Sequence, residues 1–238
     1  MPVVFVHGVP DTKRVWRAVT ERLERKDVVT VSLPGFGCPL PRGFEPTKEG
    51  YVEWLLRQLS ELNGPLDLVG HDWGALLVLR SICLRPEIAR TWAAGAAPID
   101  PDYEWHENAK VWQTPELGEQ MMSMVTPDAM VGGLVGAGVP QADAVEASRH
   151  IDDTMKQCIL TLYRSAIDVG AEWRGDLSRI SAPGLVLWGD QDPFAAPKFG
   201  ARLAENTGAR FVGYRDCGHW WQLERPEEVA AELRQLWA

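Results

Sequence analysis

Apolar positions follow two patterns that alternate along the chain: short continuous runs and stretches with helical periodicity. Six short apolar runs have the length of buried strands: 3–6, 28–31, 66–69, 91–96, 185–188 and 210–214. Stretches with helical periodicity separate several of them, such as the one after Thr47, where Val52, Leu55 and Leu59 share one face. Because strands that alternate with helices form parallel sheets, the pattern predicts an α/β fold with a doubly wound, mostly parallel sheet.

One long segment, 98–176, interrupts this alternation. It has no convincing strand and several helix-period stretches, one of which runs from 150 to about 173. A helical insertion between two strands is expected to form a lid over the carboxyl ends of the strands, where ligands bind in open α/β sheets. We therefore predict a core at 1–97 and 177–238 and a helical lid at 98–176. A glycine-rich patch at 132–138 does not lie between a strand and a helix, so it predicts no dinucleotide site.

Length, charge and composition narrow the class of protein. The 238 residues suit one globular domain with an inserted subdomain, and the net charge of −9 argues against nucleic acid or an anionic membrane surface as a partner. No apolar run has the length of a membrane span. Four widely separated cysteines indicate reduced thiols and a cytoplasmic location. Eleven tryptophans suit an enzyme whose pocket is lined by indoles and takes a small apolar organic substrate.

The stretch Gly70-His-Asp-Trp-Gly74 joins the third strand to a helix. Such a strand–turn–helix exposes one central side chain at the top of a parallel sheet, and small residues flank it because its backbone is strained. Here the central residue is Asp72. A carboxylate nucleophile needs a histidine as base and a second acid that orients the histidine. The turn after the fifth strand offers Asp190 and Asp192, and the turn after the sixth offers His219.

Three motifs carry a resemblance to known enzymes: Gly70-His-Asp-Trp-Gly74, His7-Gly-Val-Pro10 and Asp216-Cys-Gly-His-Trp220. Together they are similar to the epoxide hydrolases and haloalkane dehalogenases of the α/β-hydrolase fold. The similarity covers nearly the whole chain, and the aspartate at the centre of the first motif is quite specific to this group. The resemblance therefore implies an α/β-hydrolase fold and a hydrolase activity.

The resemblance also implies roles for individual residues. It implies that Asp192 orients His219, whereas Asp190 caps its own turn or accepts backbone N–H bonds. It further implies that an oxyanion is bound by the backbone N–H groups of Val9 and Trp73.

The chemistry follows from the carboxylate nucleophile. Asp72 is expected to attack a saturated carbon and form an alkyl-enzyme ester, which water activated by His219 then hydrolyses. A serine at this position would leave an ether that water does not cleave. An aspartate that attacked an ester carbonyl would instead form an anhydride, which is poorly matched to ordinary ester turnover. The sequence therefore disfavours a serine-esterase type of reaction.

An epoxide substrate needs a donor that protonates the departing oxygen, and lid tyrosines normally supply it. Tyr163, followed by an arginine, is similar to a tyrosine late in the lid of epoxide hydrolases. Its alternative role is that of a packing residue with a locally satisfied hydroxyl. The second lid tyrosine of that group falls at Val111 here, and Tyr103 is a candidate to replace it.

A halide substrate instead needs N–H donors aimed at a soft anion. Trp73 is one candidate, with Trp112 or Trp105 as the second, although many dehalogenases carry asparagine where this chain has Val9. We favour epoxide hydrolysis to a diol, with haloalkane dehalogenation as the first alternative and other hydrolysis in the same fold as the second. An alternative of another class is a non-catalytic ligand-binding protein, against which the complete nucleophile, acid and base speak.

The remaining histidines are expected to play supporting parts or none. His7 and His71 are interpreted as scaffold residues of the two turns that carry them. His106 and His150 are expected to be surface or lid residues without a role in the site. No metal and no cofactor are expected, because no set of ligands with metal-site spacing is present.

Overall fold

A single sheet of six parallel strands forms the centre of the computed structural model, which describes all 238 residues. The strand order is β2-β1-β3-β4-β5-β6. The strands are β1 (Val3–Val6), β2 (Val28–Val31), β3 (Leu66–His71), β4 (Ala89–Gly95), β5 (Gly184–Gly189) and β6 (Arg210–Tyr214). Each of the six apolar runs is thus a strand, and the predicted parallel, doubly wound sheet is confirmed.

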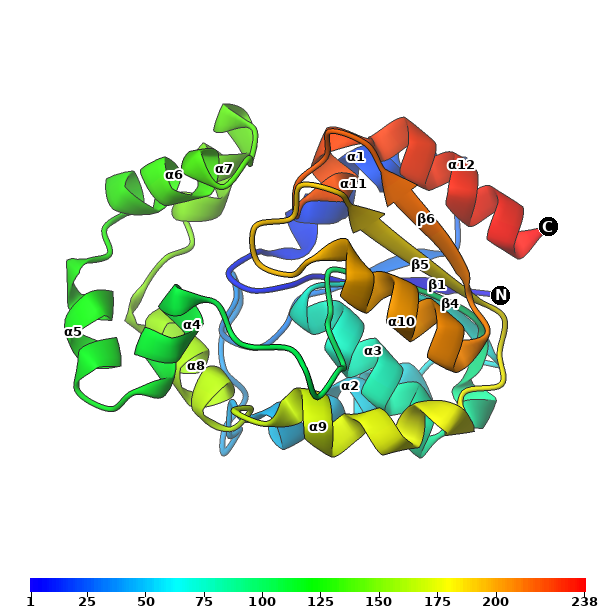
Figure 1. The fold of residues 1–238 in the computed structure, drawn as a ribbon, viewed down its shortest axis with the longest axis horizontal. Helices are drawn as coiled ribbons and strands as arrows, with labels where there is room; N and C mark the ends of the chain where they lie inside the picture. Colours follow the sequence, from blue (N-terminus) through cyan, green and yellow to red (C-terminus); the bar gives the residue numbers. More distant parts are fainter.

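Helices cover both faces of the sheet (Figure 1). One face carries α2 (Lys48–Ser60), α3 (Trp73–Leu84) and α10 (Pro197–Thr207). The other carries α1 (Arg17–Thr20), α11 (Trp221–Glu224) and α12 (Pro226–Trp237). Three short 3-10 helices complete the layers: η1 (Lys13–Trp16), η2 (Pro86–Ile88) and η3 (Gly175–Arg179). No helix in the structure combines the length and the apolar character that a bilayer crossing requires.

The segment between β4 and β5 contains helices and loops but no strand. We call its six helices the lid helices: α4 (Glu107–Gln113), α5 (Leu117–Met124), α6 (Pro127–Gly136), α7 (Gln141–Ser148), α8 (Asp153–Arg164) and α9 (Val169–Arg174). Figure 1 shows α4 to α7 standing to one side of the sheet, with α8 leading back to it. The division into a core and a separate lid at 98–176 stays a prediction.

The long helix expected from 150 to about 173 is two helices, α8 and α9, so that prediction was wrong in its extent. The break lies at Ser165, whose hydroxyl donates to the Leu162 carbonyl at 2.7 Å and accepts the backbone N–H of Lys48 at 2.8 Å. The second contact comes from the start of α2, far away in the sequence. Helical periodicity within 150–173 therefore gives no sign of this contact or of the break.

Two hydrophobic cores hold the layers together, one on each face of the sheet. The larger core has 42 buried residues and extends from α2, α3 and α10 into α8. The smaller core has 21 and extends from α1 and α12 to side chains of α6 and α7. The lid helices are therefore packed into both cores, which fixes them over the carboxyl ends of the strands.

A pair of leucine truncations tests how the core is arranged. Leu68 in β3 is completely buried, whereas Leu117 at the start of α5 is 52% exposed. We expect Leu68→Ala to lower the free energy of unfolding by about 2–5 kcal/mol, because it leaves a cavity in a packed interior. Leu117→Ala is the matched control and should change it by less than about 0.5 kcal/mol. Urea unfolding followed by fluorescence measures both, and equal losses would contradict the described packing.

Candidate active site

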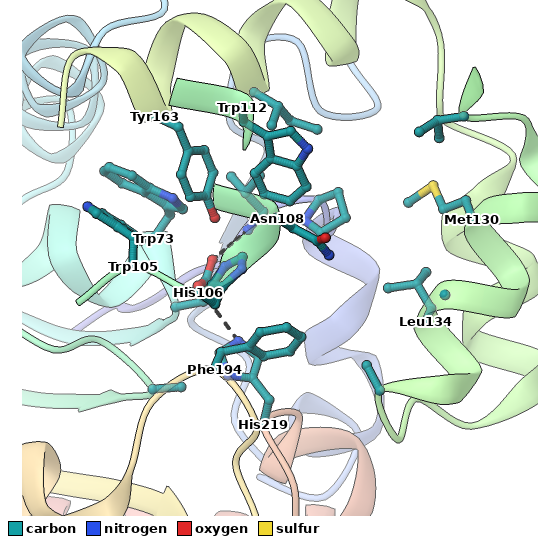
Figure 2. Close-up of a pocket in the computed structure, with 18 of the residues that line it drawn as sticks. Trp73, Trp105, His106, Asn108, Trp112, Met130, Leu134, Tyr163, Phe194 and His219 are labelled. Atoms are coloured by element: carbon teal, nitrogen blue, oxygen red, sulfur yellow. Dashed lines mark hydrogen bonds and ion pairs between the residues drawn. The ribbon is translucent and has the colours of Figure 1, made fainter. Parts of the chain in front are cut away.

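One large cavity lies between the carboxyl ends of the strands and the lid helices. Its volume is about 400 Å³, and 21 of the 28 residues that line it are hydrophobic. Figure 2 shows Tyr163, His106 and His219 on one side of this cavity and Met130 and Leu134 of α6 on the other. The cavity therefore has a polar end, where reacting groups can meet, and an apolar end.

The turn from β3 to α3 presents Asp72 to the polar end of the cavity. Its backbone lies in the left-handed half of φ/ψ space, with φ 52° and ψ −126°, a conformation that costs energy for any residue with a Cβ. A Cβ at Gly74 would lie only 2.2 Å from the carbonyl oxygen of Val6 in β1. The glycine therefore lets the first turn of α3 sit against the sheet, and this close approach sets the position of the aspartate.

The two partners of Asp72 come from the turns after β5 and β6, as predicted. His219 Nδ1 lies 2.9 Å from Asp192 Oδ2, and His219 Nε2 lies 3.7 Å from Asp72 Oδ2. The other oxygen of Asp192 accepts the backbone N–H groups of Phe194 and Ala195 at 2.8 and 3.1 Å, which fixes the carboxylate. The structure thus brings one histidine between the buried Asp192 and the partly buried Asp72.

The choice between the two acids of the β5 turn agrees with the expectation. Asp190 accepts the backbone N–H of Cys217 at 3.4 Å and makes no contact with the histidine. It therefore ties the β5 and β6 turns together, and Asp192 alone reaches His219.

Backbone N–H groups of the two turns act on the Asp72 carboxylate. The N–H of Val9 donates to Asp72 Oδ1 at 2.8 Å. Burial favours the neutral acid, but His219 outweighs it and lowers the pKa of Asp72, to which the backbone N–H of Trp73 contributes as a donor. Both N–H groups predicted to bind an oxyanion are therefore directed at the carboxylate that would become one.

His7 and His71 support the two turns that carry them, as expected. His7 Nε2 accepts the N–H of Leu33 at 3.0 Å, so its Nδ1 carries the proton and donates to the Gly8 carbonyl at 2.8 Å. His71 Nε2 donates to the carbonyl of His219 at 2.9 Å. Burial lowers the pKa of both side chains, to about 4 for His7 and about 3 for His71, so both are neutral at physiological pH.

The catalytic histidine candidate has the opposite electrostatic setting. Burial alone would lower the pKa of His219, but the carboxylates of Asp192 and Asp72 outweigh burial and raise it to about 10. The same pairing lowers the pKa of Asp192 against its own burial. At neutral pH the centre therefore holds an imidazolium between two carboxylates.

Tyr163 of α8 lines the cavity, in agreement with its resemblance to a lid tyrosine of epoxide hydrolases. It is only 3% exposed, and its ring packs edge-on against Trp73 and Trp112 at 5.5 and 4.9 Å between centroids. Its hydroxyl donates no hydrogen bond within the protein and points toward His106 in Figure 2. Burial raises the pKa of this hydroxyl well above its usual value, with Asp72 adding to the rise, so it stays protonated and able to donate.

The three indoles considered as halide donors are placed differently. The N–H of Trp105 is engaged by the carbonyls of Ala166 and Ile167, at 3.2 and 3.0 Å. The N–H groups of Trp73 and Trp112 are sealed from solvent, and the Trp73 side chain lies close enough to the Tyr163 hydroxyl to lower its pKa slightly against the effect of burial. In Figure 2 the nitrogen of Trp112 lies on the far side of its ring from Tyr163. No indole N–H of this group is presented to the cavity.

Neither Tyr103 nor Val111 supplies a second tyrosine hydroxyl to the cavity. The Tyr103 hydroxyl donates to the Phe194 carbonyl at 3.2 Å, so it is not free to replace a second lid tyrosine. Val111 lies on α4 and does not line the cavity.

His106 lies in the lid, as expected, but it also lines the cavity, which was not foreseen from the sequence. It precedes α4, and its Nδ1 accepts the backbone N–H of Ala109 at 3.3 Å as a helix cap. A capping residue lies outside the apolar face of its helix, so periodicity does not mark it. The available signal was a histidine among the lid indoles at 105 and 112.

Two further features shape the cavity. Of the tryptophans that follow His219, Trp220 lines it, whereas Trp221 is buried in the smaller core. Gly133 of α6 lines its apolar end, and no atom lies within 4 Å of the place that a Cβ would take there. The wall of the cavity is therefore open at this position of α6.

Comparison with known proteins places this site in a family. The chain matches the profile of the Alpha/beta hydrolase family over residues 3–232, which is almost its whole length. The chain belongs to the α/β-hydrolase family. This agrees with the resemblance of the three motifs and with the observed fold. It also confirms the expectation of an enzyme, a hydrolase, over that of a non-catalytic ligand-binding protein.

Individual members of the α/β-hydrolase family show how far the likeness extends. A haloalkane dehalogenase of Psychrobacter cryohalolentis is 27% identical over 99% of this chain and 82% of its own. An epoxide hydrolase of Caballeronia sordidicola is 23% identical over 97% of this chain and 85% of its own. The crystal structure of a haloalkane dehalogenase DbeA loop variant from Bradyrhizobium elkanii superposes with a TM-score of 0.79 at 18% identity, covering 99% and 89% of the two chains. The last likeness concerns the fold alone.

The charge arrangement of the site predicts how stability depends on pH. The folded-state pKa of His219 is raised from 6.5 to about 10, so its protonated form is stabilised by folding. This contribution is fully present below pH 6.5 and is lost as the pH rises toward 10. We expect the stability difference between wild type and His219→Gln to shrink over this window, as measured by urea unfolding at several pH values. Titrations of groups remote from His219 cancel in the difference, and a constant difference would contradict the pairing.

Proposed function

We propose that this hydrolase opens an epoxide to a diol through a covalent ester on Asp72. One observation carries the choice of leaving group: the Tyr163 hydroxyl is free to donate into the cavity, while the indole N–H groups of Trp73, Trp105 and Trp112 are sealed or engaged. A departing epoxide oxygen needs a proton, whereas a departing halide needs N–H donors. The Tyr163 hydroxyl, which is the donor that the cavity offers, therefore suits a departing epoxide oxygen.

In the first half of the reaction, the free oxygen of Asp72 attacks one carbon of the epoxide ring. This oxygen is Oδ2, because Oδ1 is held by the N–H of Val9. The C–O bond of the ring breaks, its electron pair goes to the epoxide oxygen, and that oxygen takes the proton of the Tyr163 hydroxyl. The products are an alkyl ester of Asp72, an alcohol on the neighbouring carbon and a tyrosinate.

Ester formation removes one of the two charges that hold the proton on His219. Without the Asp72 carboxylate, only Asp192 raises the pKa of the histidine against its burial, so that pKa falls. His219 therefore gives up its proton, and this proton restores the Tyr163 hydroxyl from the tyrosinate. The neutral imidazole is then the base that the second half of the reaction requires, and the alkylated state itself produces it.

In the second half, His219 takes a proton from water, and the hydroxide attacks the carbonyl carbon of the ester. The oxyanion that forms on Oδ1 is bound by the N–H groups of Val9 and Trp73, which already surround the carboxylate. Collapse of this intermediate breaks the bond to the diol oxygen, which takes the proton from His219. The carboxylic acid left at Asp72 passes its proton to His219, which restores both the carboxylate and the imidazolium, and the net reaction is epoxide plus water to diol.

The substrate class follows from the rest of the lining. With 21 hydrophobic residues among 28, the cavity suits a small apolar organic molecule whose epoxide is its polar part. The scheme uses only side chains, backbone donors and water, so no cofactor is proposed. Dehalogenation stays the second candidate, supported by the similarity to the Psychrobacter enzyme. It requires Trp73 and Trp112 to turn their N–H groups into the cavity.

Trapping the ester tests the nucleophile and the substrate together. His219→Gln should form the ester but not hydrolyse it, because the base is gone. After incubation with hexene oxide, we expect intact-mass spectra to show a gain equal to the whole epoxide, located on the peptide that contains Asp72. After incubation with bromohexane we expect no hexyl adduct.

The double variant Asp72→Ala/His219→Gln is the control and should gain no mass with either compound. In parallel, wild type should release diol from hexene oxide and no bromide from bromohexane. A hexyl adduct accompanied by bromide release would establish the dehalogenase alternative. An epoxide adduct in the double variant would exclude Asp72 as the nucleophile.

Two lid substitutions separate the readings at the level of rate. Tyr163→Phe removes the proton donor and should slow ester formation by roughly 100- to 10,000-fold, the usual contribution of a general acid. Trp112→Phe removes an indole N–H that faces away from Tyr163 and should slow it far less. Single-turnover kinetics with hexene oxide measures this step directly. A larger loss in Trp112→Phe than in Tyr163→Phe would reject the epoxide mechanism.

A further inference from the structure

His106 lies on the wall of the cavity, between Tyr163 on one side and Phe194 and His219 on the other. Its ring lies 6.4 Å from that of Tyr163 and 4.9 Å from that of Phe194, between centroids. Phe194 in turn packs against His219 at 5.0 Å. Figure 2 shows His106 below the hydroxyl of Tyr163 and above Phe194. The imidazole is therefore close to the space in which an epoxide oxygen would be protonated.

The hydrogen-bonding state of this imidazole is fixed by the helix that follows it. Nδ1 accepts the backbone N–H of Ala109 at 3.3 Å, and an accepting ring nitrogen carries no proton. In the neutral ring the proton is therefore on Nε2. Burial, the largest influence, lowers the pKa of His106, so the ring is neutral at physiological pH.

The Nε2–H donor is left without a partner. No group of the protein accepts a hydrogen bond from it. The hydroxyl of Tyr103, which also lines the cavity, is engaged by the Phe194 carbonyl. A helix cap alone needs only Nδ1. The structure thus holds a donor in one protonation state and one orientation, at the edge of the cavity, with nothing in the protein to receive it.

We propose that the Nε2–H of His106 binds the epoxide oxygen together with the hydroxyl of Tyr163. This assignment rests on the proposed function. Tyr163 gives its proton to the oxygen, whereas His106 keeps its proton and donates a hydrogen bond as negative charge develops, so the atom balance of the ring opening is unchanged. Two donors at fixed positions also hold the oxygen on one side of the cavity, which orients the ring carbons toward Asp72.

Two substitutions separate this role from helix capping. His106→Asn keeps a side-chain acceptor for the α4 cap, since asparagine is a favoured capping residue, but it is too short to replace Nε2–H. His106→Gln extends an amide N–H toward the position of Nε2 and loses the cap geometry. We expect His106→Asn to melt like wild type and to form the Asp72 ester on the order of 10–100-fold more slowly, the effect of one charge-assisted hydrogen bond.

The expected pattern has two further parts. His106→Gln should recover much of the rate of ester formation in spite of a lower melting temperature. Hydrolysis of the ester should proceed at the wild-type rate in both variants, because His219 and Asp192 are untouched. Stopped-flow tryptophan fluorescence with hexene oxide, with quenched-flow mass spectrometry of the ester, resolves the two steps.

Three outcomes would overturn the assignment. An ester-formation rate in His106→Asn within twofold of wild type would leave His106 only its capping role. A rate in folded His106→Gln as low as in His106→Asn would show that the donor is not what matters. If wild type opens no epoxide, the proposed function fails and this inference fails with it. If wild type opens epoxides and His106→Asn is unaffected, only this inference fails.

Discussion

The site is organised around His219, held between the carboxylates of Asp192 and Asp72. Two buried carboxylates close together would be very unfavourable without compensation, because each loses its hydration. The imidazolium supplies the opposite charge, and backbone N–H groups from Val9, Phe194 and Ala195 satisfy further lone pairs. Each of these donors belongs to a turn at the carboxyl end of a strand. The sheet therefore provides the site with both its geometry and its charge balance.

This arrangement makes the protonation of the histidine depend on the state of the nucleophile. While Asp72 is a free carboxylate, the pKa of His219 is high and the histidine cannot act as a base. An esterified Asp72 carries no charge, and the same histidine becomes neutral. In the proposed mechanism a single residue thus changes its role without moving, because the covalent intermediate changes the electrostatic potential around it.

The arrangement of the reacting groups was open to prediction because it follows from local motifs and parallel topology. Asp72, Asp192 and His219 each lie in a turn after a strand, and parallel strands end at the same edge of the sheet. The orientation of the lid side chains could not be predicted, since it depends on contacts between distant parts of the chain. The N–H of Trp105, for example, is taken by carbonyls some sixty residues later. No pattern in the sequence marks such partners.

The same limit applies to the lid helices. α8 ends where Ser165 meets the backbone of Lys48. The proposed role of His106 depends on the direction of Nε2, because Nδ1 is used by the helix cap. Tyr163 was found through its resemblance to a lid tyrosine of epoxide hydrolases, and its place on the buried face of a regular helix agrees with that assignment. Capping residues and helix ends obey no such spacing, and here they line or position the part of the cavity on which the leaving group depends.

The wall of the cavity at Gly133 is open. Glycine inside a helix is less favourable than alanine by about 1 kcal/mol, and α6 contains three glycines. At position 133 this loss of helix stability coincides with an exposed part of the cavity wall, where a methyl group would meet no atom. An alanine at this position would therefore strengthen the helix without touching the sheet or the turns that carry Asp72, Asp192 and His219.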